Sequence, residues 1–591
     1  MLFKCSRSLA LSIEILCLVP AAVTAQPLIS SEGNGSVWGI VNAGSFAIQG
    51  MPNAPVAEGS IFAIFGTGLG PATPVHATSF PLGTSLGGVS IAVSQGALAP
   101  VAAIPVYVSA TQIDAIMPSN TPLGANTVTV TFDGKSSSAS CPTCPSPSVQ
   151  VIPAGFGIFS VNHSGGGQGS LTNRNNQPVS YSSPAAAGEV LNLWGTGLGA
   201  IGNDTLPPAA GDIGPNTVMV YVGGVEVPTL YHGRSPCCSG VDQIQFVVPP
   251  KIVGCSVPVA VRIGEGPASN FVSIAIAPNG GLCSNPDGID GADLASAAAS
   301  GFVSSGYINL SHSLSSSGVV DSGYASFEKY PYSDFDLTQQ VPLQMPNLGA
   351  CSVFAYDLTN SSNSYVNAPT PNVNPAPGAG LDAGPSITIA GPNGQKQITP
   401  ANPGGAYTAT LASDSNPGDY YYGSSSLFLS PGSYTISSQG GSGVGPFHVS
   451  VQMPPPVTWT IQGDDAGIVT RVDGATVEWT GADPNSYIII SGTSASQNIT
   501  YNSADATMGY FGGAAGFNCT AKGSDGEFTI PPIVLSALPA SGLLYYNSSV
   551  GAPEGLLQVS SIAPPVKFSA RGLNLAEAGA STLVSATVTY R

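Results

Sequence analysis

Residues 57–70 read AEGSIFAIFGTGLG, and residues 187–199 repeat the pattern as AGEVLNLWGTGLG. Each copy is a short apolar run that leads into a glycine-rich turn. Such runs are typical of strands, and the glycines allow the positive φ that a tight turn requires. The recurrence of the whole stretch indicates two tandem copies of one β-rich unit.

The two copies continue in the same order beyond this stretch. Each has a strand in which apolar residues alternate with others, which is the period of a half-buried strand. Each then has a segment that ends in proline, at 112–118 and 243–249, followed by further alternating strands. Strands at this spacing, punctuated by Gly and Pro, predict a β-sandwich in each copy. The alternating residues are Val89, Ile91 and Val93 in the first copy and Val218, Val220 and Val222 in the second.

The order of these motifs resembles the IPT/TIG immunoglobulin-like fold. With the connection from 157–160 to 184–188, residues 38–280 resemble the uncharacterised Solibacter-type C-terminal domain family of bacterial secreted proteins. The resemblance implies an all-β protein of tandem immunoglobulin-like β-sandwich modules. That domain usually ends a protein, whereas here a long segment follows it. The family supplies no reaction and no catalytic residues, so the resemblance implies fold and location only.

The second half also carries strand and turn signals. The turn at 391–394, GPNG, predicts a hairpin, and the alanine-rich stretch at 293–300 can form a short helix. The prolines at 454–456 indicate a boundary. The predicted division is a signal peptide at 1–25, IPT/TIG-like β-sandwiches at 26–158 and 159–280, a linker at 281–325, and β-rich modules at 326–455 and 456–591.

Composition limits the classes of partner. Only 8% of the residues are charged, and the net charge is −18. Nucleic acid and anionic membranes both require clustered Lys and Arg, and the 14 basic residues are scattered, so the sequence argues against both as partners. Beyond the N-terminal segment, no apolar stretch reaches the ~20 residues of a membrane-spanning helix.

The first 25 residues predict secretion. Lys4 and Arg7 precede an apolar stretch at 9–19, and small residues before Gln26 suit a cleavage site. We therefore expect a secreted or cell-surface protein, exported through an N-terminal signal peptide.

The cysteines beyond this segment are even in number, which in an exported chain predicts disulfides. Cys141 and Cys144 have redox or zinc spacing, but they lie in a Ser/Pro-rich loop, which favours a local disulfide. If Cys351 pairs with Cys519, the two C-terminal modules form one closely packed assembly. The sequence leaves the connectivity open. The candidates are Cys141, Cys144, Cys237, Cys238, Cys255, Cys283, Cys351 and Cys519.

Several motifs suggest chemistry that their context does not support. Residues 83–87, GTSLG, match a hydrolase nucleophile elbow but precede a strand where that motif needs a helix. Residues 195–200 match a dinucleotide fingerprint, again without a following helix. The five histidines are far apart in the sequence. We therefore interpret the glycines as turn residues and predict no catalytic site, cofactor site or metal site.

Asp287, Asp290 and Asp293 leave calcium as an alternative. Their spacing of three residues does not match the alternating ligands of an EF-hand. An Asp-rich linker of an exported protein can nevertheless offer oxygen ligands between modules.

The sequence thus favours a non-catalytic binding or scaffolding protein. Its partner is a polysaccharide or another surface protein, and the sequence does not say which. The alternative is an extracellular hydrolase acting on polysaccharide, with a carboxylate pair in the C-terminal half, because such a pair leaves no sequence signature. A third hypothesis is a spacer that holds another module away from the cell.

Overall fold

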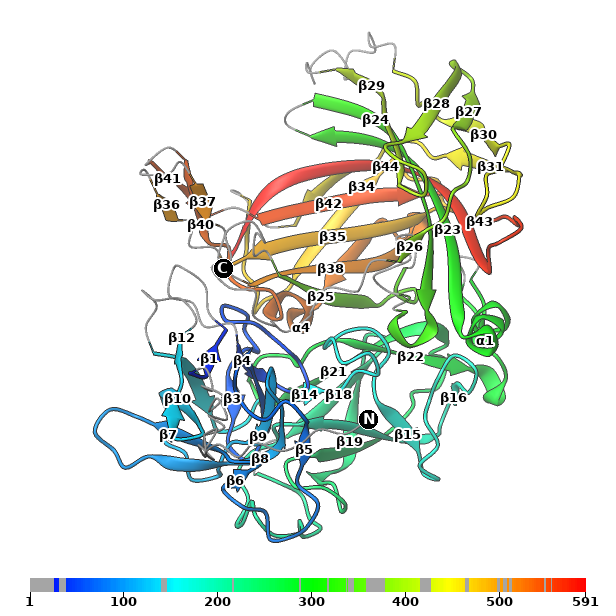
Figure 1. Ribbon diagram of the computed structural model, residues 1–591. Coiled ribbons are helices and arrows are strands. Elements are labelled where there is room, and N and C mark those ends of the chain that lie inside the picture. The colour runs from blue at the N-terminus through cyan, green and yellow to red at the C-terminus, as the bar shows by residue number, and fades with distance from the viewer. Residues whose placement is uncertain are drawn as a thin grey trace, which may run out of the picture.

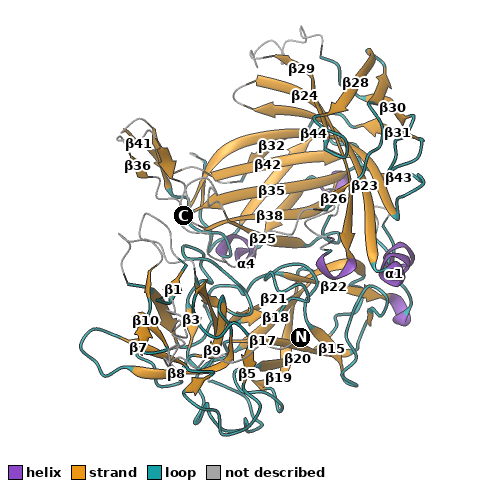
Figure 2. Ribbon diagram, viewed as in Figure 1, coloured by secondary structure: helices purple, strands orange, loops and turns teal. Residues whose placement is uncertain are grey.

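The computed structural model describes residues 26–30, 39–139, 146–214, 217–285, 289–315, 318–335, 337, 345–357, 378–414, 427–462, 467–496, 500–502, 507–509, 513–546, 549–553 and 555–591. The predicted signal peptide at 1–25 lies outside them. The described secondary structure is nearly all β, so the predicted all-β class is confirmed (Figures 1 and 2). In this part of the chain no helix is long and apolar enough to cross a membrane.

The first sandwich spans residues 28–152. β4 and β9 pair in one sheet, and β7 and β10 pair in the other. β8 joins the two, because its residues 101–103 pair with β7 and its residues 104–108 pair with β9, with a register shift between Pro105 and Tyr107. Its strands are β1 (Leu28–Ile29), β2 (Ile40–Asn42), β3 (Val56–Ala57), β4 (Ile61–Thr67), β5 (Val75–His76), β6 (Ser85–Leu86), β7 (Val89–Ser94), β8 (Val101–Val108), β9 (Gln112–Ile116), β10 (Gly124–Phe132), β11 (Lys135–Ser136), β12 (Ser138–Ala139) and β13 (Ser148–Ile152).

The second sandwich repeats this topology. The order β17-β20-β19-β18-β21 matches the order β4-β9-β8-β7-β10 of the first sandwich. The alternating residues predicted to point inward are buried in both copies. The duplicated sequence therefore folds as a duplicated sandwich. Its strands are β14 (Gly157–Ile158), β15 (Leu171–Asn173), β16 (Ala185–Ala186), β17 (Val190–Thr196), β18 (Val218–Val222), β19 (Val225–Arg234), β20 (Asp242–Val247), β21 (Gly254–Ile263) and β22 (Val272–Ala277).

A larger assembly follows, and we call its strands β25-β38-β35-β42-β44-β23-β24 the central sheet. Figure 1 shows these strands above the two sandwiches. The helical elements of the described residues include η1 (Pro278–Gly280), which follows the last strand of the second sandwich, and α1 (Gly291–Ser300), η2 (Tyr332–Asp334), η3 (Gly523–Asp525) and α4 (Pro532–Ser536). Its strands are β23 (Phe302–Ser315), β24 (Gly318–Pro331), β25 (Cys351–Asp357), β35 (Tyr487–Ala495), β38 (Gly513–Lys522), β42 (Gly555–Ile562) and β44 (Leu575–Tyr590).

Two further sheets cover one face of the central sheet. β32-β34-β39 and α4 enclose a core that includes Ile488, Phe517 and Leu557. β27, β30 and β31 enclose a second core with β23, β24 and β44. The remaining strands are β26 (Ala379–Gly380), β27 (Ile387–Gly391), β28 (Gly394–Pro400), β29 (Tyr407–Asp414), β30 (Gly432–Ser438), β31 (Phe447–Met453), β32 (Thr458–Ile461), β33 (Ile468–Val469), β34 (Ala475–Thr480), β36 (Thr500–Asn502), β37 (Thr507–Gly509), β39 (Glu527–Ile530), β40 (Leu543–Tyr546), β41 (Ser549–Pro553) and β43 (Val566–Lys567).

The structure differs from the predicted division of the second half. Residues 302–315 and 318–325, predicted as part of a linker, form β23 and part of β24, and β23 pairs in parallel with the last strand, β44. The central sheet thus runs across the boundary predicted at 455/456. Parallel pairing of segments so distant leaves no local pattern, which is why the sequence placed a linker here. The predicted short helix and the hairpin at 391–394 are both present, as α1 and the β27–β28 turn.

Candidate functional site

Period-2 alternation gives the central sheet two chemically different faces. In β35, β38 and β42 one set of alternate residues is apolar and enters the core, as Ile490, Phe517 and Val559 do. The other set points to the opposite face and is mixed, because polar residues such as Ser491 and Gln558 alternate there with apolar ones. The covered face stabilises the sheet, and the opposite face carries the hydrogen-bonding groups.

Strand register places five of these polar residues in one line across the sheet. β44 and β42 pair Ser585 with Gln558, and β42 and β35 pair Gln558 with Ser491. β38 then places Asn518 opposite Ser491, and β25 places Ser352 opposite Asn518. We call Ser585, Gln558, Ser491, Asn518 and Ser352 the transverse row. Adjacent strands lie ~4.8 Å apart, so the row extends roughly 19 Å.

The transverse row has no ionisable side chain, and all five residues are half-buried. Ser491 Oγ donates a hydrogen bond to Asn518 Oδ1 at 2.8 Å, which orients the amide. The outer face of β28 and β31 is different, because Gln395, Gln397 and Gln452 are exposed there. The transverse row is therefore a partly sheltered strip of hydroxyl and amide groups.

A buried apolar cluster lies on one side of the transverse row, and a small pocket lies at its other end. A buried cluster that includes Tyr307, Met345 and Tyr487 lies on the same face, and Lys522 Nζ lies 3.9 Å from the centre of the Tyr487 ring. At the other side, Ser352 also lines a pocket of about 50 Å³ where the two sandwiches meet the central sheet. The row thus ends at a small recess lined by both polar and apolar residues.

The face of the transverse row carries two glutamates in the C-terminal half, where the sequence predicts a carboxylate pair. β24 carries Glu328 and β44 carries Glu577, on either side of β23. Glu328 Oε2 accepts hydrogen bonds from the Tyr330 hydroxyl and from Gly378 N, and Glu577 is 2% exposed. Burial, Tyr324 and Glu577 raise the pKa of Tyr307. Glu328 therefore belongs to a hydrogen-bonded cluster and Glu577 is buried, and the hydrolase alternative stays a prediction.

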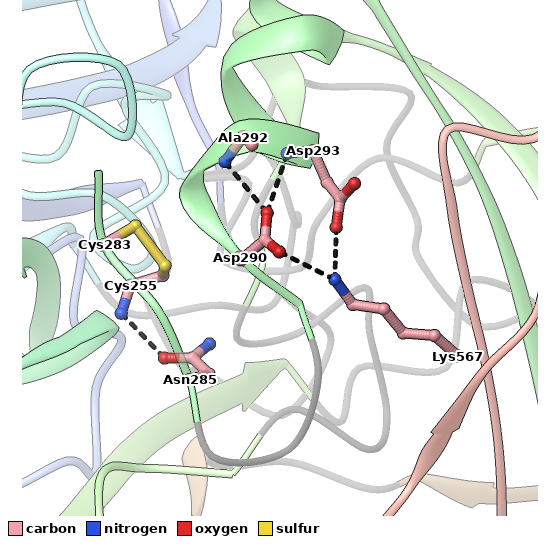
Figure 3. Close-up of a disulfide and its surroundings, with 7 residues drawn as sticks. All are labelled: Cys255, Cys283, Asn285, Asp290, Ala292, Asp293 and Lys567. Atoms are coloured by element: carbon pink, nitrogen blue, oxygen red, sulfur yellow. Dashed lines mark hydrogen bonds and ion pairs between the residues drawn. A yellow bond between two sulfur atoms is a disulfide. The ribbon is translucent and has the colours of Figure 1, made fainter. Parts of the chain in front are cut away.

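Asp290 and Asp293, two of the three predicted calcium ligands, form ion pairs with Lys567. Asp290 Oδ1 caps α1 by accepting hydrogen bonds from Ala292 N and Asp293 N (Figure 3). Lys567 Nζ, from β43, lies 3.1 Å from Asp290 Oδ2 and 2.6 Å from Asp293 Oδ2. Asp287 lies outside the described residues. Among the described residues no group of three His, Cys, Asp or Glu side chains could hold a metal ion.

Six of the eight predicted disulfide candidates form three disulfides. The pairs are Cys237–Cys238, Cys255–Cys283 and Cys351–Cys519. The Cys255–Cys283 bond ties β21 to the segment before α1 (Figure 3). Cys141 and Cys144 lie outside the described residues.

The glycine motif at 195–200 serves as part of a contact between the two sandwiches. Gly197 N and Leu198 N donate to Asp242 Oδ2 at 2.7 and 2.8 Å. Asp242 also pairs with Arg234, whose Nη2 donates to the carbonyls of Gly59 and Gly199. Because Arg234 and Asp242 are 2% and 0% exposed, this is a buried ion pair.

The GTSLG stretch at 83–87 and the histidines also have the surroundings of structural residues. Ser85 lies in the short strand β6, which pairs with the next strand, β7. A nucleophile elbow would need a helix after the serine, and a strand follows instead. Four of the histidines are exposed or half-buried. His312 is the exception, because its Nδ1 lies 2.7 Å from Asp321 Oδ1 in a buried pair between β23 and β24. No motif in the sequence indicates this pair, since only the hairpin register brings the two residues together.

No protein-family model and no curated protein matches the chain. Three solved structures show distant likeness. SGBP-B of a Bacteroides ovatus mixed-linkage glucan utilization locus, in complex with a mixed-linkage heptasaccharide, is 10% identical (81% of this chain, 93% of that chain, TM-score 0.14). The I67–I69 fragment of the titin I-band is 7% identical (71% and 98%, TM-score 0.10). A DUF4784 family protein from Bacteroides caccae is 8% identical (93% and 98%, TM-score 0.13). These likenesses are too distant to indicate a function.

Proposed function

We propose that the chain is an extracellular, non-catalytic binding protein and that the transverse row binds an uncharged polysaccharide. The observation that carries the proposal is the row itself, five half-buried polar residues on five neighbouring strands without a charge among them. Serine hydroxyls and the amides of Asn and Gln both donate and accept hydrogen bonds. Sugar hydroxyls do the same, so the two surfaces are complementary.

Charge favours a neutral ligand over an acidic one. The net charge of −18 repels polyanions, and the single cation described beside the row, Lys522, lies over the Tyr487 ring. An extracellular location is supported by the three disulfides, which persist in oxidising compartments. The predicted signal peptide agrees with this location.

The test is a panel of immobilised polysaccharides probed with the oxidised full chain. The proposal expects binding to at least one neutral polysaccharide, with little change in affinity between 50 mM and 500 mM salt, because no ion pair forms. Binding confined to uronate or sulfated polymers, or no binding to any neutral polymer by folded protein, would refute it.

A further inference from the structure

The loop between β19 and β20 carries a disulfide between neighbouring residues. Cys237 and Cys238 are both exposed to solvent. The other described disulfide cysteines are between 0% and 5% exposed. Of the three disulfides, Cys237–Cys238 is therefore the one that a dissolved thiol reaches without prior unfolding.

The base of the same loop forms part of the contact between the sandwiches. Thr196 Oγ1 donates to Gly240 O at 2.6 Å and accepts from Ile61 N, in the first sandwich, at 2.8 Å. A Cβ on Gly240 would lie 2.6 Å from Ile61 Cγ1, so the loop backbone packs directly on the first sandwich. The buried pair of Arg234 and Asp242 flanks the loop on both sides. The loop thus shares its hydrogen bonds and its packing with the contact between the sandwiches.

A buried hydroxyl lies beside one sulfur of this disulfide. Ser235 Oγ is 3.0 Å from Cys237 Sγ and accepts a hydrogen bond from Cys237 N. Ser235 is 0% exposed. Because a disulfide sulfur carries no hydrogen, the Ser235 hydroxyl is the donor in this contact.

We propose that Cys237–Cys238 is a site of thiol–disulfide exchange with a small dithiol and that its reduction loosens the contact between the two sandwiches. One thiolate of the dithiol attacks Cys238 Sγ, and the electron pair of the broken bond leaves on Cys237 Sγ, where the Ser235 hydroxyl stabilises it. The second thiolate of the reagent then displaces Cys238 as a thiolate. The protein disulfide gains two electrons, the dithiol becomes a cyclic disulfide, and both cysteines take up the protons that the dithiol releases.

The first test is the order of reduction in the folded full chain. Dithiothreitol is added in steps, free thiols are alkylated, and peptides are quantified by mass spectrometry. Cys237 and Cys238 are expected to be alkylated at least tenfold faster than Cys255, Cys283, Cys351 and Cys519. Equal or slower alkylation of Cys237 and Cys238 would overturn the assignment of the site.

The second test addresses the hydroxyl. Ser235→Ala is expected to slow reduction of this disulfide several-fold, because the leaving thiolate loses its donor. Ser239→Ala is the matched control in the same loop, since its hydroxyl bonds Leu206 O and does not contact sulfur. Equal rates in the two variants would overturn the role of Ser235.

The third test asks whether reduction loosens the contact between the sandwiches. Amide hydrogen exchange is compared between the oxidised chain and the same chain in which Cys237–Cys238 alone is reduced. Exchange at the Ile61 amide, which donates to Thr196, is expected to accelerate at least several-fold. The amides of 488–490 in the central sheet are the internal control. Unchanged exchange at Ile61 would overturn the coupling.

Discussion

Cys351 and Cys519 lie directly opposite each other on β25 and β38, and they form a disulfide across 168 residues of chain. The bond fastens the edge strand β25, which brings Ser352 into the transverse row. Both sulfurs enter the core beneath the central sheet. The disulfide therefore supports the same strand pairing that creates the candidate site.

Replacing both residues, Cys351→Ala with Cys519→Ala, should destabilise the central sheet by roughly 2–5 kcal/mol, because a long loop is released in the unfolded chain. Urea unfolding followed by tryptophan fluorescence reports this loss, since Trp459 and Trp479 pack in the same core. The double variant Cys237→Ser with Cys238→Ser is the comparison, because its disulfide closes no long loop and its removal acts on the contact between the sandwiches and not on the central sheet. Equal losses in the two double variants would contradict the account.

Arg234→Met should weaken the contact between the two sandwiches. It leaves the buried Asp242 carboxylate without its cation and the carbonyls of Gly59 and Gly199 without a donor. Breaking a buried pair in this way costs about 3–5 kcal/mol. Urea unfolding with limited proteolysis measures the effect, and Arg174→Met, at an exposed position, is the control. If the urea midpoint of Arg234→Met is no lower than that of Arg174→Met, the buried ion pair does not stabilise the contact.

The pair of Lys567 and Asp290 should stabilise the protein in a pH-dependent way. Burial acts to raise the pKa of Asp290, but the Asp293 backbone N–H and the Lys567 ammonium outweigh it, so the pKa lies below its ordinary value. The contribution is complete above the ordinary carboxyl pKa of about 3.9 and is lost as the pH falls through the folded value.

Melting temperatures of the protein and of Lys567→Met test this expectation. The difference between them should be largest at pH 6 and should shrink as the pH is lowered toward 3. It should also shrink in high salt, because the pair is partly exposed. A difference that does not change with pH would show that the ion pair does not act in this way.

The hydrolase alternative can be tested at Glu328 and Glu577. We expect no release of reducing ends from a bound polysaccharide, and we expect Glu577→Gln to bind it as the unmodified chain does. Reducing-end assays over long incubations check this. Release that disappears in both Glu328→Gln and Glu577→Gln would make the chain an enzyme.

Local patterns in the sequence predicted the local parts of the fold. The alternation at Val89, Ile91 and Val93 and the GPNG turn at 391–394 depend on neighbouring residues, and the structure has a strand and a hairpin there. The pairing of β23 with β44 joins residues 305–314 to 575–584. No short-range pattern encodes such a pairing, and the cysteines 351 and 519 were the one hint that the two halves join.

The candidate site could not be predicted either, because it also depends on pairing between distant segments. Ser491 and Gln395 are both polar residues in alternating strands, and the sequence does not distinguish a half-buried position from an exposed one. The transverse row exists through the combined register of five strands from distant parts of the chain. The Asp242 carboxylate and the GTGLG amides likewise meet only after β17 and β20 pair.

The most direct test of the central claim is calorimetric titration of a neutral polysaccharide, chosen from the panel, into matched variants. Gln558→Ala and Asn518→Ala lie in the transverse row, and Gln395→Ala lies on the exposed outer face of β28. Each row variant should bind about tenfold more weakly, in line with the ~1–2 kcal/mol of a lost hydrogen bond, while Gln395→Ala binds as the unmodified chain does. Unchanged affinity in both row variants, with folded protein, would contradict the assignment of the site.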